Sequence, residues 1–481
     1  MVAALAAIVA FGQWQFRLDT TFRTEIMYEY VNSIAVESDG VILSGVMRFP
    51  AEMSDRLLTK LNEEGDRIPS FPFAYGGGKL TRWNDRFYVG VGQTLRRVWP
   101  TGVVDGQFNE PNLSPYFTAS QGGDYHVYED GRVLVTGSHM LSDSIRGFVG
   151  SYQLIWFSNQ GYLDTTRIHR QANGLLWRFT ALPDGKFLCS CNCSVYDGQP
   201  VGRIFRIHED GSLDTTFQTD VNSGSVAAYY PLADGRVLVG GNFRRAAEPD
   251  QILQFVRFMP DGSLDPSFNN FMYFGVADGL NSIPKVTNIV YWQDDMYFVM
   301  GVFRNVDGET RGGICVVDTT GQLLPYMDEC LTGPFTYFGN TMASVHGIVP
   351  TPDGTGFYIN GTYTGYTDGT INDTLQRFVS RLLVEEVNVA VREKEPPMAP
   401  FRIQPNPAKD QVTFTYSQAL EDDPSESITI RDLGGKVIAM LPANATGLTT
   451  WYAGELRTGV YMVEYVSAGS IVHQEKLIVA R

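Results

Sequence analysis

Apolar and polar residues alternate in short runs from residue 13 to about residue 384, and most of these runs follow an Asp-Gly turn. A clear copy is Asp234-Gly235-Arg236-Val237-Leu238-Val239-Gly240, and six other stretches share its frame: residues 39–45, 84–90, 130–135, 184–188, 294–298 and 353–357. Alternation with a period of two is typical of half-buried strands, and an Asp-Gly turn is typical of a hairpin. The pattern therefore predicts short strands joined by hairpins.

A second signature, Gly-x-x-Asp-x-x-Phe, lies between these runs. It is clearest from Gly262 to Phe268, and related segments begin at residues 65, 102, 161, 211 and 321. A further copy without the Gly, Arg17-Leu18-Asp19-Thr20-Thr21-Phe22, stands alone near the N-terminus. The runs recur about every 52 residues, a period typical of propellers and solenoids.

Each repeat reads as four antiparallel strands, A to D. In the fifth repeat these are residues 225–232, 236–243, 252–259 and 264–268. Tight turns join A to B and C to D, so these turns share one face of the predicted fold, the turn face. The B–C loops and the crossings to the next repeat share the opposite face, the loop face.

The last repeat lacks a D strand of its own. Its A, B and C strands are predicted at residues 343–350, 355–363 and 374–384, and the copy at residues 17–22 can supply the fourth strand. Such pairing removes two open sheet edges. The sequence thus predicts an all-β fold: a seven-bladed β-propeller of four-stranded blades over residues 13–384, closed by its N-terminal strand.

These residues resemble a known repeat. Leu213-Asp214-Thr215-Thr216-Phe217, together with residues 234–243, is similar to the delta-60 repeat, a β-propeller repeat of bacterial exported proteins. The match is weaker in the second, sixth and seventh blades; in the sixth, Leu324 and Met327 replace the motif Asp and Phe. The resemblance implies fold and export, and it implies no reaction.

A charged, proline-ended linker is predicted at residues 385–400, followed by a small β-sandwich at residues 401–481. Segments 404–410, 430–437, 456–461 and 476–479 resemble, in order, the type A sorting domain of type IX secretion. The resemblance implies the secretion machinery as a partner and a location outside a Gram-negative cell, secreted or attached to its surface. A fibronectin-like accessory module is the alternative. The matching motif residues include Pro405, Asn406, Pro407, Gly435, Gly459 and Tyr461.

Residues 1–12 are apolar and end in Ala10-Phe11-Gly12, a small-x-small pattern typical of signal cleavage. We predict a signal peptide whose start can lie further upstream, because a basic segment is missing; a buried N-terminal strand is the alternative. No later stretch has the roughly 18 consecutive apolar residues of a membrane span. The net charge of −16 argues against a nucleic-acid partner.

Catalytic and cofactor motifs are missing from the sequence: it has no His-Glu-x-x-His, Gly-x-Ser-x-Gly or phosphate loop. The segment Asn305-Val306-Asp307-Gly308-Glu309 resembles a calcium loop but lacks its density of carboxylates. No cofactor or metal is predicted. Five aspartates stand just past turns, where a carboxylate accepts backbone N–H groups, and we interpret them as structural: Asp19, Asp105, Asp164, Asp214 and Asp265.

The five cysteines are too few and too odd in number for a disulfide scaffold. Cys189, Cys191 and Cys193 alternate along one strand, so they are predicted to face one side and pack as small apolar groups; a metal site is the alternative. Cys315 and Cys330 lie on neighbouring predicted strands and can pair if the register aligns them.

Three crossings on the loop face are rich in aromatic residues, which can stack on sugars or hold a peptide. The alternative is that these rings fill gaps between blades. The predicted ligand-binding residues are Tyr116, Phe117, Phe271, Tyr273, Phe274, Phe335, Tyr337 and Phe338, with Arg244 and Arg304 from the B–C loops. The predicted function is binding or scaffolding, with carbohydrate or protein as ligand. An extracellular hydrolase or lyase with carboxylates at the channel mouth is one alternative, and a purely structural surface protein is another.

Overall fold

A computed structural model describes residues 13–72, 75–276, 280, 282–387, 401–416, 426–432, 435–443, 446–467 and 470–480. The chain divides into two compact units after Val387, and each is described by itself. The predicted signal peptide, residues 1–12, and residues 388–400 of the predicted linker lie outside the described residues. Within the described residues, no helix has the length and apolar character needed to span a membrane.

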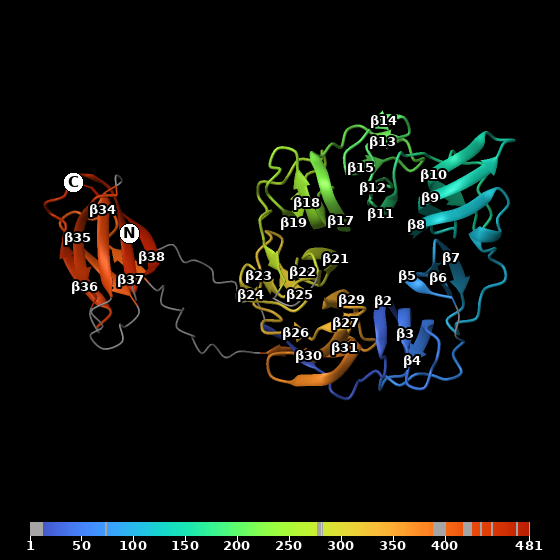
Figure 1. Ribbon diagram of the computed structural model, residues 1–481, viewed down its shortest axis with the longest axis horizontal. Helices are drawn as coiled ribbons and strands as arrows, with labels where there is room; N and C mark the ends of the chain where they lie inside the picture. Colours follow the sequence, from blue (N-terminus) through green and yellow to red (C-terminus); the bar gives the residue numbers. More distant parts are fainter. Residues whose placement is uncertain are drawn as a thin grey trace. The chain divides into compact units, whose positions relative to one another are not determined.

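Successive stretches of the first unit fold into small antiparallel sheets that follow one another around a ring (Figure 1). The innermost strand of each sheet comes first in the chain. The sheets are β2 (Tyr28–Glu37), β3 (Gly40–Arg48) and β4 (Arg56–Leu61); β5 (Gly77–Trp83), β6 (Arg86–Val91) and β7 (Thr94–Val98); β8 (Phe117–Val127), β9 (Val133–Asp143) and β10 (Phe148–Phe157); β11 (Leu176–Ala181), β12 (Phe187–Cys191), β15 (Ile204–Ile207) and β16 (Leu213–Asp214); β17 (Val221–Pro231), β18 (Val237–Arg245) and β19 (Leu253–Phe258); β21 (Lys285–Tyr291), β22 (Tyr297–Val302) and β25 (Ile314–Val317); β29 (Ser344–Pro350), β30 (Gly356–Thr367) and β31 (Asn372–Val387).

The predicted A, B and C strands of the fifth repeat correspond to β17, β18 and β19, but the predicted D strand is much shorter. Leu264 forms a single bridge to Phe258. The next residue, Asp265, accepts the backbone N–H of Ser267 at 2.8 Å, so the backbone turns away from the sheet. The same carboxylate that marks the repeat in the sequence therefore ends its fourth strand.

The N-terminal strand β1 (Gln13–Leu18) pairs antiparallel with β31, in a register that places Arg17 opposite Leu383. It ends earlier than predicted because Asp19 begins a turn in which its Oδ1 accepts the Thr21 N–H at 2.9 Å. β31 continues to Val387, so pairing with β1 extends the sheet beyond the predicted propeller end at residue 384. Phe22 and Val31 share a core with Tyr358, which joins the first and last sheets.

Short elements on the loop face connect several crossings to the hairpin of the following sheet. Tyr273 donates its N–H to Asp307 Oδ1 at 2.8 Å, and Ser142 donates to the Tyr116 carbonyl at 2.9 Å. These elements are η1 (Pro111–Leu113), β13 (Val195–Tyr196), β14 (Gln199–Pro200), β20 (Phe274–Gly275), β23 (Asn305–Val306), β24 (Glu309–Thr310), β26 (Leu331–Thr332), β27 (Phe335–Tyr337) and β28 (Asn340–Met342).

The second unit contains two antiparallel sheets that share one core. Phe414 and Ile430 come from different sheets and are both fully buried. One sheet is β32 (Phe401–Gln404), β33 (Gln411–Tyr416) and β36 (Leu448–Tyr452); the other is β35 (Val437–Pro442), β34 (Ser427–Asp432), β37 (Gly459–Ser467) and β38 (Ser470–Val479).

Candidate functional site

The repeat aspartates lie on the turn face and hold basic side chains. Asp265 Oδ2 accepts Arg257 Nε at 2.7 Å and Arg236 Nη1 at 2.9 Å, while Oδ1 accepts Ser267. Arg257 also lies 4.7 Å from the centre of the Phe268 ring. Asp105 pairs with Arg86 and Arg97, and Asp214 pairs with Lys186 and Arg206. Asp19 pairs with Arg381, and Asp164 accepts a hydrogen bond from the Thr166 N–H.

These contacts determine the charge of the carboxylates. Burial raises the pKa of Asp265, but hydrogen bonds from Ser267, Arg236 and Arg257 outweigh burial and hold the pKa well below its usual value. The carboxylate is therefore charged at neutral pH, with both oxygens already accepting protein donors. Within the described ranges, no group of three or more His, Cys, Asp and Glu side chains is arranged to hold a metal ion.

The structure divides the predicted aromatic residues into buried and exposed ones. Phe117 and Phe274 are core residues: Phe117 packs edge-on against Phe157 at 5.0 Å, and Phe274 against Phe303 at 5.0 Å. The expectation that these two rings face a ligand is wrong, because each lies in a strand that turns its side chain inward. Tyr116, Phe271, Tyr273 and Phe338 are exposed, and Phe335 and Tyr337 are partly buried.

One group of aromatic residues forms a connected, partly exposed surface, which we call the aromatic cluster: Tyr28, Phe335, Tyr337 and Phe338. The rings of Tyr28 and Tyr337 meet edge to face at 4.9 Å, and Tyr337 and Phe338 at 4.3 Å. Phe338 is 85% exposed. The Arg48 guanidinium lies 4.5 Å from the centre of the Tyr28 ring, on the side of the cluster near β3.

Local backbone geometry explains the position of Phe338. It occupies, with Gly339, the two-residue turn between β27 and β28, and both have positive φ, at 47° and 78°. Glycine adopts this conformation readily, whereas a bulky residue does so rarely. An aromatic residue held at an unfavourable backbone position and projected into solvent is more consistent with a binding role than with a packing role.

Tyr28 and Arg48 escaped the sequence analysis because neither lies in an aromatic crossing. They are opposite each other in the β2–β3 register, Tyr28 to Arg48. Counting outward from the hairpin at Asp39-Gly40 would place Phe49 opposite Tyr28. A bulge between Val31 and Ser33 shifts the register by one residue to Arg48, so the sequence carries no direct signal of this pair. Asp55 orients the Arg48 guanidinium through an Nε–Oδ1 hydrogen bond of 2.8 Å.

The two predicted arginines lie elsewhere on the loop face. Arg304 donates its N–H to the Gly275 carbonyl at 2.7 Å and its guanidinium to the Thr332 carbonyl. Burial lowers the pKa of Arg304, consistent with a side chain that braces two crossings. Arg244 is partly exposed, opposite Ser223 in the β17–β18 register.

A cavity of about 660 Å³ lies among the innermost strands β2, β5, β8, β11, β17, β21 and β29. Asp124 is the carboxylate among its described lining residues, and its oxygens contact Lys79 Nζ at 2.7 Å and Arg178 Nη1 at 3.5 Å. Glycoside hydrolysis by the common mechanisms needs two carboxyl groups in defined positions. The cavity lining does not supply that pair.

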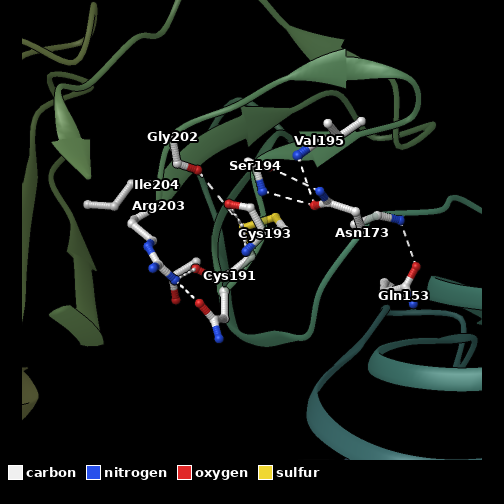
Figure 2. The surroundings of a disulfide bond; sticks show 12 residues. Gln153, Asn173, Cys191, Cys193, Ser194, Val195, Gly202, Arg203 and Ile204 are labelled. Atoms are coloured by element: carbon white, nitrogen blue, oxygen red, sulfur yellow. Dashed lines mark hydrogen bonds between the residues drawn. A yellow bond between two sulfur atoms is a disulfide. The ribbon is translucent and has the colours of Figure 1, made fainter. Parts of the chain in front are cut away.

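The cysteine predictions need correction. Cys191 and Cys193 form a disulfide with a Cα–Cα distance of 5.2 Å (Figure 2). β12 ends at Cys191, so the chain turns there and Cys193 does not continue the alternation on one strand face. Cys315 and Cys330 are unpaired because they belong to different cores: Cys315 packs with residues such as Phe255, and Cys330 with residues such as Tyr363.

Several sorting-motif residues of the second unit contact its last strand, β38. Asn406 Nδ2 donates to the Lys476 carbonyl at 2.6 Å, and Asn406 Oδ1 accepts the Ile478 N–H at 2.8 Å. Asn406 stands between Pro405 and Pro407 in the connection that follows β32. Gly435 has a φ of 82° in the turn before β35, Gly459 pairs with Val479, and the Tyr461 hydroxyl donates to the Arg457 carbonyl at 2.9 Å.

No curated protein matches the sequence. Among solved structures, the extracellular domain of a one component system from B. thetaiotaomicron is 12% identical with a TM-score of 0.37, and the match covers 98% of this chain and 58% of that one. A protein of unknown function from Bacteroides caccae is 11% identical with a TM-score of 0.34, and the match covers 60% of this chain and 93% of that one. The Neurospora crassa Pan2 WD40 domain is 10% identical with a TM-score of 0.32, and the match covers 75% of this chain and 90% of that one. TM-scores this low do not define the topology.

Two sequence families match parts of the chain. Residues 182–217 and 232–268 match a domain of unknown function, DUF5122, described as a beta-propeller, and residues 402–480 match the secretion system C-terminal sorting domain. The sorting domain implies export by the type IX machinery, so the protein is secreted or attached to the outer surface of a Gram-negative bacterium. The chain thus contains DUF5122 beta-propeller segments within residues 182–268 and a secretion system C-terminal sorting domain at residues 402–480.

Proposed function

We propose that the first unit is a seven-bladed β-propeller, closed by β1, that binds carbohydrate outside the cell through the aromatic cluster on its loop face. The antiparallel sheets around the ring and the pairing of β1 with β31 support this arrangement. Domain boundaries near residues 13 and 387 follow from the same pairing. Export supplies a setting in which surface and environmental glycans are the abundant ligands.

The exposure of Phe338 beside Tyr337 and Tyr28 carries this proposal. Exposed rings of this kind are costly to leave in water and offer flat apolar faces, while a tyrosine hydroxyl and an arginine offer hydrogen bonds. Tyr28 and Tyr337 hydroxyl oxygens lie 3.1 Å apart, and Arg48 is adjacent. Rings beside fixed polar groups are the combination that recognises a sugar, whose faces are apolar and whose edges carry hydroxyls.

The hydrolase or lyase alternative is less well supported. It requires carboxylates at the channel mouth, and Asp124 in the cavity is already paired with Lys79 and Arg178. Burial raises the Asp124 pKa, but the charges of Lys79 and Arg178 together with hydrogen bonds from Lys79 and the Tyr125 N–H outweigh burial and lower the pKa, so the group is not a proton donor at neutral pH. The second alternative, a purely structural surface protein, differs from both because it predicts that the first unit binds no ligand.

The experiment is a glycan array probed with the full chain and with the double variant Tyr337→Ala, Phe338→Ala. Tyr162→Ala is the matched control, because Tyr162 is an exposed tyrosine at a C–D turn on the opposite face. We expect the double variant to lose at least tenfold in apparent affinity while the control binds normally. Binding that survives in the double variant would contradict the site, trimming of the glycan would favour the enzyme, and failure to bind any glycan would favour a protein ligand or a structural role.

A further inference from the structure

The central cavity carries a positive charge although the protein as a whole is acidic. Its charged lining residues are Lys79, Arg178 and Asp124, which leave an excess of one positive charge in a chain of net charge −16. His346 also lines the cavity and is neutral, because burial lowers its pKa to about 4. A concave surface lined by one sign of charge concentrates ions of the opposite sign.

The two cations face the cavity while the carboxylate is covered. The Lys79 and Arg178 side chains are 42% and 43% exposed, whereas that of Asp124 is 6% exposed. Arg178 Nε donates to the Ala227 carbonyl at 2.9 Å, and its Nη1 is near Asp124. Among the described residues, Nη2 has no hydrogen-bond partner, and Arg178 is part of the cavity lining.

Asp124 fixes the positions of both cations. Its Oδ1 accepts the Tyr125 N–H at 2.8 Å, and its own N–H donates to Thr136 Oγ1 at 2.8 Å. Lys79 Nζ also donates to the Tyr125 carbonyl at 2.7 Å. The cations are thus held in place before any ligand arrives, and binding loses less side-chain entropy.

We propose that this cavity is a second binding site, separate from the aromatic cluster, that takes a small polar ligand bearing a carboxylate. The carboxylate lies between Lys79 Nζ and Arg178 Nη2. Charge-assisted hydrogen bonds from a guanidinium and an ammonium group to a carboxylate are stronger than neutral ones. The volume of about 660 Å³ suits a ligand of one or two sugar rings. Tyr30, Asn32 and Asn288 supply polar groups along the wall.

The test is isothermal titration calorimetry of the full chain with glucuronate, and with glucose as the neutral probe, at low salt. We expect glucuronate to bind at least tenfold more tightly than glucose and to weaken as salt is added. Arg178→Gln keeps the length and polarity of the side chain and is expected to weaken glucuronate binding at least tenfold. Arg132→Gln, which removes an arginine paired with Asp130 outside the cavity, is the control and is expected to bind normally.

Lys79→Met makes the test sharper because it removes the second cation. It lowers the net cavity charge by one unit, so glucuronate binding is expected to weaken several-fold in a variant that circular dichroism shows to be folded. Equal affinity for glucuronate and glucose, no binding of either, or unchanged binding in Arg178→Gln would overturn the proposal. Glucuronate binding that persists in Tyr337→Ala, Phe338→Ala separates this site from the aromatic cluster.

Discussion

Arg381 donates to Asp19 Oδ2 through Nε at 2.7 Å, although 362 residues separate them in the chain. Arg381 also lies 5.3 Å from the centre of the Phe22 ring. Arg257 makes the same two contacts within one repeat, with Asp265 and Phe268. The N-terminal segment therefore occupies the place of a D segment beside β31.

We expect Arg381→Met to lower the melting temperature by a few degrees. The substitution leaves the largely buried Asp19 carboxylate without its cation, and a lost hydrogen bond to a charged group costs about 2 kcal/mol. Arg132→Met is the control, because Arg132 pairs with the exposed Asp130 and exposed pairs contribute less than about 1 kcal/mol. Differential scanning calorimetry measures both variants.

Deleting residues 13–22 tests the same contact on the scale of the whole strand. The deletion exposes the edge of β31 and removes Phe22 from the core it shares with Tyr358. We expect a much larger fall in melting temperature and a tendency to aggregate through the open edge. An unchanged melting curve would show that β1 does not close the ring.

Stability is expected to fall between pH 6.5 and pH 4. Burial lowers the pKa of His126, His169 and His346 to about 4, from a usual value of 6.5. Between these values the unfolded chain binds more protons than the folded one, so acidification favours unfolding. The stability that the neutral buried histidines contribute is therefore fully present only above pH 6.5. His139 also has a pKa lowered by burial, so His346→Gln should remove only part of the loss. His208→Gln, at an exposed position, is the control. Melting temperatures across this range measure the slope, and an identical slope in His346→Gln would refute this assignment.

Thiol accessibility is expected to differ between the native and unfolded protein. Cys189, Cys315 and Cys330 are buried and unpaired, and burial raises the pKa of Cys315 and Cys330 to about 12. Thiolates are the reactive form, so iodoacetamide should label none of these residues before unfolding and all three afterwards. Mass spectrometry should find Cys191 and Cys193 joined in a peptide that gains mass only after reduction. A disulfide between Cys315 and Cys330 would contradict the structure.

Removing the second unit is expected to block export without unfolding the first. The two units share no sheet among the described strands, so the truncated propeller should keep its melting temperature but remain in the periplasm. Fractionation and surface labelling of the bacterium measure the location. Normal surface display of the truncation would contradict the sorting role.

Asn406→Ala offers a finer version of this test. It removes two side-chain hydrogen bonds to β38, at the Lys476 carbonyl and the Ile478 N–H. We expect the second unit to lose about 1–3 kcal/mol of stability because the two backbone groups lose their partner. Export should decline in proportion, whereas Gln411→Ala, at an exposed position outside the 404–410 segment, should be exported normally.

The sequence by itself determined the strands and their connections. Alternating residues and Asp-Gly turns are local signals, so the β17–β18–β19 hairpins were predicted within a few residues from the chain around Asp234 and Asp261. The pairing of the N-terminal segment with the last sheet was also predicted. The N-terminus carries a motif copy at Asp19 that belongs to no complete repeat, and the last repeat lacks a D strand. The sorting domain was recognised from four ordered motifs.

Only the tertiary structure decided which of these residues are available to a ligand. Phe274 and Phe338 look alike in the sequence, but packing between sheets buries the first while a two-residue turn projects the second. Lys79, Asp124 and Arg178 come from the first strands of three successive sheets and meet because these sheets pack side by side. Contacts between residues this far apart in the sequence depend on the arrangement of whole sheets, and local sequence patterns do not predict that arrangement.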